Sequence, residues 1–141
     1  MDLTFIPYKE IGKLRFKANN DSAIKVFGSP VSQSMYGYPE KNKHLYDYGF
    51  FHVLLSEKLE FEAIELFPEM TDEKICLIYN NLNIMLDPSV NITLDELKKA
   101  TDDLILDDDG EGYTSTKLGL RIYCPDDIVE QVIIHDANYK F

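Results

Sequence analysis

The sequence predicts an α+β fold in which antiparallel sheet carries short helices packed on one face. Short apolar runs with the period of strands, bounded by turn residues, are the first observation that supports this fold class. Two brief helical patterns with capping residues are the second. The third is a repeated order of strand, helix, irregular loop, strand and strand, at residues 11–67 and again at 82–135. We therefore expect a single domain over residues 1–141 with two similar β-α-β-β halves, because a small sheet with one helix cannot cover its apolar face alone.

The first half begins with Ile11–Lys17, where apolar and basic residues alternate as in a half-buried strand. Asn19 and the two residues after it can cap a short helix, which Gly28 and Pro30 would end. Residues 29–49 are expected to form a loop, because they are rich in turn formers and tyrosine. Two strands with a turn between them should follow, at Phe50–Leu55 and Glu60–Phe67.

The second half begins in Thr71–Leu86, which is ambiguous between helix and strand. Two short β-rich runs around an Asn-Asn pair favour strands there. Thr93 is expected to cap the helix of LDELKKA, with Glu96 completing a capping box. The stretch Asp102–Asp136 opens with an acidic loop and then predicts two strands joined at Pro125–Asp127.

The charge of the chain is strongly negative and unevenly distributed. The formal net charge is −11 and the isoelectric point is near 4.6. Residues 95–136 hold twelve acids against four bases, whereas residues 1–50 hold seven bases against five acids. This balance argues against nucleic acid as a partner, because phosphate contacts need Lys and Arg. The acidic end is either a well-solvated face or a contact surface for a cationic partner.

Several features indicate a cytoplasmic protein that has no membrane partner. Cys76 and Cys124 lie in apolar stretches without metal-ligand spacing, so we expect free buried thiols in a reducing compartment. The N-terminal residues lack the apolar segment of a signal peptide. No apolar run approaches the roughly 20 residues that cross a bilayer.

The motifs of catalysis and of metal binding are missing or incomplete, so we expect no enzyme, no cofactor and no metal. The acidic loop resembles a calcium loop with Gly112 at position six, yet position twelve is Leu118 where a bidentate Glu is required. The histidines are scattered, and no nucleophile lies in an activating motif. An enzyme that uses a carboxylate pair is left open, because the chain has many carboxylates.

Two loops are candidate contact surfaces. The acidic loop supplies clustered carboxylates, and the loop of residues 29–49 supplies tyrosines, which give large contact area with a polar tip. Packing within strands and core is the alternative role for the tyrosines. The candidate site residues are Asp107, Asp108, Asp109, Glu111, Tyr36, Tyr38, Tyr46 and Tyr48.

Several pieces of the chain resemble bacterial immunity proteins that are encoded beside polymorphic or contact-dependent growth inhibition toxins. These pieces are IGKLRF followed by a helix ending in VFGSP, then LNIMLDPSVNITLDELKKA, and then YTSTKLGLRIYCPDDIVEQVIIHD. The order of helix, turn and antiparallel strands is also similar to the tandem-repeat fold of β-lactamase inhibitory protein. The resemblance implies a cytoplasmic protein that binds and neutralises one cognate toxin.

The acidity of the chain suits a basic, nuclease-type toxin, because clustered acids can mimic phosphate and steer association. A protein-interaction or regulatory module with the same acidic surface but no toxin partner is the alternative. Neither reading requires a cofactor, a nucleic acid or a membrane.

Overall fold

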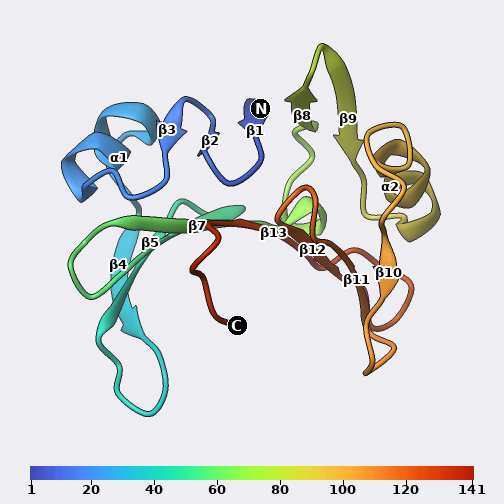
Figure 1. The fold of residues 1–141 in the computed structure, drawn as a ribbon. Helices are drawn as coiled ribbons and strands as arrows, with labels where there is room; N and C mark the ends of the chain where they lie inside the picture. Colours follow the sequence, from blue (N-terminus) through green and yellow to red (C-terminus); the bar gives the residue numbers. More distant parts are fainter.

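The computed structural model describes residues 1–141 and has an α+β fold built in two layers (Figure 1). One layer is an eight-stranded antiparallel sheet that bends into an arch. The other layer covers the convex side of the arch and contains two short helices and a second, smaller sheet (Figure 1). The opposite, concave side of the large sheet carries no helix (Figure 1).

The large sheet is built from the strands that follow each helix along the chain. In spatial order its strands are β10 (Ile105–Leu106), β11 (Gly112–Ser115), β12 (Leu120–Tyr123), β13 (Gln131–His135), β7 (Phe61–Leu66), β6 (Phe51–Leu55), β5 (Lys43–Asp47) and β4 (Ser32–Tyr36). The last strands of the two halves, β7 and β13, pair at its centre, with Ile64 opposite Ile134. The large sheet therefore places β4 at one edge and β10 at the other.

The smaller sheet also takes strands from both halves. In spatial order its strands are β3 (Leu14–Arg15), β2 (Glu10–Ile11), β1 (Asp2–Ile6), β8 (Ile75–Tyr79) and β9 (Leu82–Leu86). β1 and β8 run parallel, and the other pairs are antiparallel. A single 3-10 turn, η1 (Pro68–Met70), leads from β7 toward β8.

Each half follows its helix with four antiparallel strands instead of the expected two. Helix α1 (Asn20–Phe27) follows the hairpin of β2 and β3, and helix α2 (Val90–Leu97) follows the hairpin of β8 and β9. The expected loop at residues 29–49 is in fact the hairpin of β4 and β5. The expected pair of strands after the acidic loop becomes β11, β12 and β13, and short β10 precedes it.

The predicted strand Ile11–Lys17 is wrong, because the chain turns back on itself within it. Gly12 and Lys13 have φ values of 61° and 71°, and this left-handed pair forms the turn between β2 and β3. The alternation itself is correct. Leu14 and Phe16 are buried, while the basic side chains that alternate with them are exposed.

The sequence predicted the start of helix α1 correctly but not the start of helix α2. The Asn19 side chain accepts a hydrogen bond from the Ser22 amide at 2.9 Å, so the expected cap of α1 is confirmed. Helix α2 begins three residues before Thr93, so the expected cap there is wrong. Thr93 is fully buried, and its hydroxyl donates to the Asp87 carbonyl at 2.7 Å. The strands expected within Thr71–Leu86 are confirmed as β8 and β9.

The main hydrophobic core lies between the large sheet and the helix-bearing layer. It contains 26 buried residues drawn from both halves of the chain, so the halves share one core. A smaller cluster on the concave side consists of Leu54, Ala63 and Ile133. The two cysteines are free and buried. Neither eight-residue helix is long or apolar enough to cross a membrane.

Candidate functional site

The concave side of the large sheet forms a face that the short segment after β13 partly covers. This segment, residues 137–141, runs beneath the arch (Figure 1). Tyr139 packs against the concave cluster beside Tyr36 and Leu45. Its ring also contacts His135, at 5.8 Å between centroids. We call this side of the sheet, together with residues 137–141, the concave face.

A partly open cavity of about 760 Å³ lies in the concave face between β4, β5 and residues 139–141. Aromatic rings supply much of its wall. Lys43 reaches it from β5 and Glu65 from β7, and Lys140 lines it as well. The side chains that matter for its chemistry are Tyr36, Tyr38, Lys43, Glu65, Tyr139 and Phe141. The cavity is therefore a mixed aromatic and charged pocket.

The Tyr36 hydroxyl is buried at this cavity and has no hydrogen-bond partner. Burial, followed by the nearby Tyr139 hydroxyl, raises the pKa of Tyr36 well above its ordinary value. Burial and then the charge of Glu65 raise the pKa of Tyr139 to about 12. Both hydroxyls therefore stay neutral near pH 7, and they lie beside one another at the pocket.

The charged groups in the middle of the concave face are largely paired with one another. Lys43 Nζ lies 3.0 Å from a Glu62 carboxylate oxygen and 5.4 Å from the centroid of the Tyr139 ring. His52 Nδ1 lies 3.1 Å from Glu65 Oε1. These contacts hold the side chains of β5, β6 and β7 in fixed positions beneath the arch.

The acidic loop is the tight turn between β10 and β11, at the far edge of the same sheet. Asp107 is half-buried there and accepts hydrogen bonds from Arg121 Nε at 2.8 Å and from Thr114 Oγ1 at 2.6 Å. Asp109 Oδ1 accepts from the Glu111 amide at 2.9 Å, which shapes the turn. Asp107 is therefore part of the scaffold and is not freely available to a partner.

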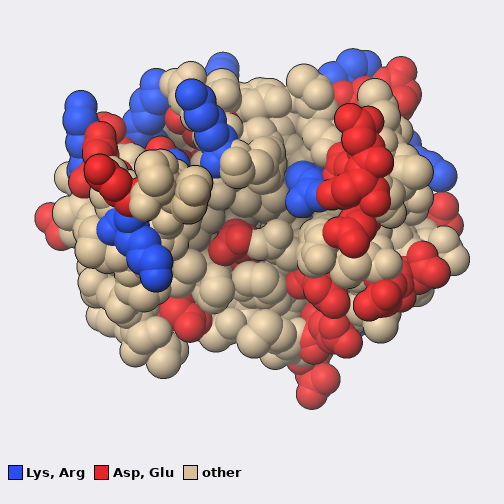
Figure 2. Space-filling model, turned by 90° about the horizontal axis from the view of Figure 1, so that it is seen from below, with Lys and Arg blue, Asp and Glu red and all other residues tan.

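The remaining carboxylates of the turn, those of Asp108, Asp109 and Glu111, are exposed. Arg121 Nη2 approaches Asp109 at 3.7 Å, and neither Asp108 nor Glu111 forms an ion pair. Figure 2 views the molecule from below, and acidic side chains gather at the right of that view, the side that holds β10 to β12 in Figure 1. We call Asp108, Asp109 and Glu111 the acidic turn.

The four candidate tyrosines do not form one surface. Tyr36 and Tyr38 both line the cavity, and Tyr38 is 97% exposed. Tyr46 faces the opposite side of the sheet and belongs to the main core. Tyr48 also packs on that side, where its ring stacks on Phe51 and its hydroxyl donates to the Gly28 carbonyl at 2.8 Å. Tyr46 and Tyr48 are therefore scaffold residues, as the alternative reading of the tyrosines holds.

Local sequence reasoning missed several side chains of the concave face. Glu65 lies on β7 and Arg121 on β12, and their partners His52 and Asp107 are 13 and 14 positions away, beyond the reach of a local pattern. Tyr139 and Phe141 follow the last strand and have no pattern around them. For Arg121 the sequence does hold a signal, because Arg121 stands between the buried Leu120 and Ile122, and this alternation places it on the side of the sheet opposite the core.

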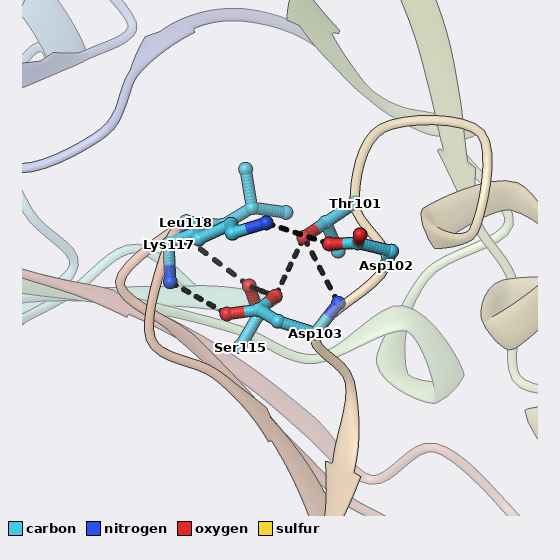
Figure 3. Close-up of polar contacts among 6 residues, drawn as sticks. All are labelled: Thr101, Asp102, Asp103, Ser115, Lys117 and Leu118. Carbon is cyan, nitrogen blue, oxygen red and sulfur yellow. Dashed lines mark hydrogen bonds and ion pairs between the residues drawn. The ribbon is translucent and has the colours of Figure 1, made fainter.

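A separate acid, Asp103, anchors the chain where it leaves α2 for β10 (Figure 3). Its carboxylate accepts hydrogen bonds from the Ser115 hydroxyl at 2.6 Å and from the Lys117 amide at 2.8 Å. The Thr101 hydroxyl donates a third at 2.5 Å. Burial alone would raise the pKa of Asp103, but these hydrogen bonds together lower it to about 2. This network fixes the turn between β11 and β12 and supplies no free carboxylate.

No group of three or more His, Cys, Asp or Glu side chains is placed so as to hold a metal ion. No family model, no curated protein and no solved structure matches the chain. Function is therefore inferred from the concave face and the acidic turn.

Proposed function

We propose that this protein is a cytoplasmic immunity protein that binds and neutralises one basic, nuclease-type toxin through its concave face. The carrying observation is that a partly open aromatic cavity and the exposed acidic turn belong to the same eight-stranded sheet. The strongly negative charge and the resemblance of several segments to toxin-associated immunity proteins support the same reading.

The cavity offers the kind of anchor site that protein interfaces use. Aromatic side chains bury large area at low entropic cost, and binding energy concentrates where an anchor fills a desolvated pocket. Tyr38 is almost fully exposed, so a partner that covers it removes apolar surface from water.

The acidic turn supplies charge that a basic partner would meet. Its three carboxylates are solvated and only weakly paired, so they are free to attract Lys and Arg side chains. Exposed charges of this kind act mainly on the association rate, and salt weakens them over a screening length of roughly 8 Å. The paired charges at the centre of the face fix orientation instead.

Co-expression with the product of the adjacent upstream gene, where we expect the toxin to be encoded, tests the proposal directly. We expect rescue of growth and co-purification of a complex. Absence of both would contradict an immunity function. A complex on the concave face without growth rescue would favour the alternative, a non-toxin interaction or regulatory module.

Association kinetics then test the acidic turn. The triple variant Asp108→Asn, Asp109→Asn, Glu111→Gln should slow association by about tenfold at low salt and flatten its salt dependence. The matched control is Asp2→Asn, Asp72→Asn, Asp95→Asn, which removes three exposed acids without hydrogen bonds outside the concave face. A rate that falls equally in both triple variants would assign the effect to net charge alone.

Dissociation kinetics test the cavity. Tyr38→Ala should raise the dissociation rate by about tenfold or more, since truncating an interface anchor costs upward of about 2 kcal/mol. Ile92→Ala removes an exposed apolar side chain from α2 and should leave the complex unchanged. An intact complex with Tyr38→Ala would move the contact away from the cavity.

A further inference from the structure

The two sheets end in four edge strands, and three of these edges are protected against pairing with another strand. β10 has only two residues, which is too short to pair with a further strand over any length. β3 also has two residues, and one of them is the exposed Arg15. β9 is longer, but the Glu96 side chain of α2 accepts a hydrogen bond from the Met85 amide at 3.0 Å. Short length, charge and coverage are the usual protections of a sheet edge.

β4 is the one edge of the four that lacks these protections. It has five residues, Ser-Gln-Ser-Met-Tyr, with no charge and no proline. All but the last are exposed, and no side chain bonds to their backbone. Val31, just before the strand, is 82% exposed and Met35 is 51% exposed. An open, uncharged edge of this length is a template for a further strand.

We propose that β4 pairs with β4 of a second copy of this chain, antiparallel and about a two-fold axis at Ser34, so that two large sheets join into one. The inference is independent of the proposed toxin binding. In antiparallel pairing at this register, residues that lie opposite one another project on the same side of the joined sheet. The concave side of one copy therefore continues into the concave side of the other. The two concave faces therefore open on the same side of the dimer.

The side chains of β4 complement their own copy in this register. Tyr36 lies opposite Ser32, Met35 opposite Gln33, and Val31 opposite Gly37, so each large side chain meets a small or flexible one. Met35 and Val31 project on the helix side of the sheet, and Met35 is the diagonal neighbour of both Met35 and Val31 of the other copy. Each copy thus contributes two apolar side chains, Val31 and Met35, that are exposed in the monomer and lie at the junction of the dimer.

The charge distribution also favours this edge over the others. Residues 29–36 contain no charged side chain, so the pairing strands do not repel one another. The acidic turn lies at the opposite edge, roughly 30 Å away across seven strand spacings. That separation exceeds the screening length of roughly 8 Å, so the two acidic ends scarcely interact. Pairing of β4 with β10 of another copy is disfavoured because β10 has only two residues.

Cysteine cross-linking tests the axis. In Ser34→Cys the two introduced thiols meet directly, and opposed residues of antiparallel strands lie about 4.5–5.5 Å apart between Cα atoms, within disulfide range. Mild oxidation should convert this variant to a covalent dimer of twice 16.3 kDa. Ser32→Cys is the matched control, because its two thiols would lie roughly 13 Å apart along the strands. The native cysteines are buried and should not cross-link.

Sedimentation velocity with the full chain tests the same pairing without cross-links. The protein should shift from 16.3 kDa toward twice that mass as its concentration rises. Met35→Lys should raise the dimer dissociation constant by about tenfold or more, because like charges would meet across the axis. Ile105→Lys, on the opposite edge, should leave the constant unchanged. A protein that stays monomeric at every concentration, or equal cross-linking of both cysteine variants, would overturn the proposal.

Discussion

Arg121 and Asp107 form an ion pair across the edge of the concave face, with Arg121 Nε 2.8 Å from Asp107 Oδ2. Their side chains are 22% and 17% exposed. Arg121 lies on β12 and Asp107 begins the turn between β10 and β11, so the pair ties three strands together. Because of this contact, Asp107 has a structural role, whereas the three carboxylates of the acidic turn remain available to a partner.

Removing the structural carboxylate should destabilise the protein. Asp107→Ala leaves Arg121 half-buried without its main partner and should lower the free energy of unfolding by about 2 kcal/mol. Asp108→Asn, at the next position, should change it by less than about 0.5 kcal/mol. Chemical denaturation of the two variants checks the difference. Equal stabilities would show that the ion pair is not structural.

Gly112 should tolerate no side chain. A Cβ atom there would lie 2.3 Å from the Ile122 carbonyl oxygen, which belongs to the backbone and cannot swing away. Gly112→Ala should therefore lower the free energy of unfolding by about 3 kcal/mol. Gly110→Ala, two residues away, has φ of 73° but nothing within 4 Å of its Cβ, so only about 1 kcal/mol of backbone strain is expected. Thermal unfolding of both variants measures the contrast.

Two tyrosine hydroxyls should behave in opposite ways when removed. Tyr36→Phe deletes a buried hydroxyl without a partner and should leave stability unchanged or raise it by up to about 1 kcal/mol. Tyr48→Phe deletes the hydrogen bond to the Gly28 carbonyl and should cost about 0.5–1 kcal/mol. Denaturant midpoints at pH 7 provide the comparison. A clear loss of stability in Tyr36→Phe would reveal a partner for its hydroxyl.

Asp103 should make stability depend on acid pH. Its pKa is about 2 in the folded protein and about 3.9 in an unfolded chain, so the unfolded state binds the proton first. The stabilisation is complete above about pH 5 and is lost as pH falls through about 4 toward 2. Asp103→Asn should cost about 2 kcal/mol at neutral pH, and its deficit should shrink below pH 4.

Unfolding curves from pH 7 to acid measure this deficit. Asp126→Asn replaces an exposed carboxylate without hydrogen bonds and serves as the control. A deficit for Asp103→Asn that stays constant with pH would contradict an ionised Asp103.

Short-range sequence patterns correctly predicted the elements that are determined by neighbouring residues, namely β6, β7 and α1. The strands β6 and β7 are rich in apolar residues and are separated by a predicted turn, and α1 carries both its cap and its stop. The strand β4 was not predicted, because an exposed edge strand shows no alternation of apolar and polar residues and Ser-Gln-Ser resembles a loop. The cap predicted at Thr93 was wrong, because the capping-box pattern also occurs inside a helix. There the Thr93 hydroxyl donates a hydrogen bond to the Asp87 carbonyl.

The clustered charge of the sequence predicted where the candidate site lies, but it could not predict which of the carboxylates are free to contact a partner. Clustered aspartates marked the turn after β10 correctly as a turn at the surface. Which of them is free depends on Arg121, fourteen positions further along, and only pairing of β11 with β12 brings it there. Likewise, Tyr46 and Tyr48 could be assigned to the core only once β5 was known to be a strand with two sides.

The pairing of β7 with β13 has a consequence for how the chain acquires its structure. When the last residue of β7 has been synthesised, more than sixty residues must still be added before its neighbour β13 begins. Until then Ile64 and Leu66, which are fully buried in the finished protein, line a strand with an open edge. Long-range pairing of this kind is slow and leaves the nascent chain prone to self-association. The large sheet can be completed only after β13 has been made and pairs with β7.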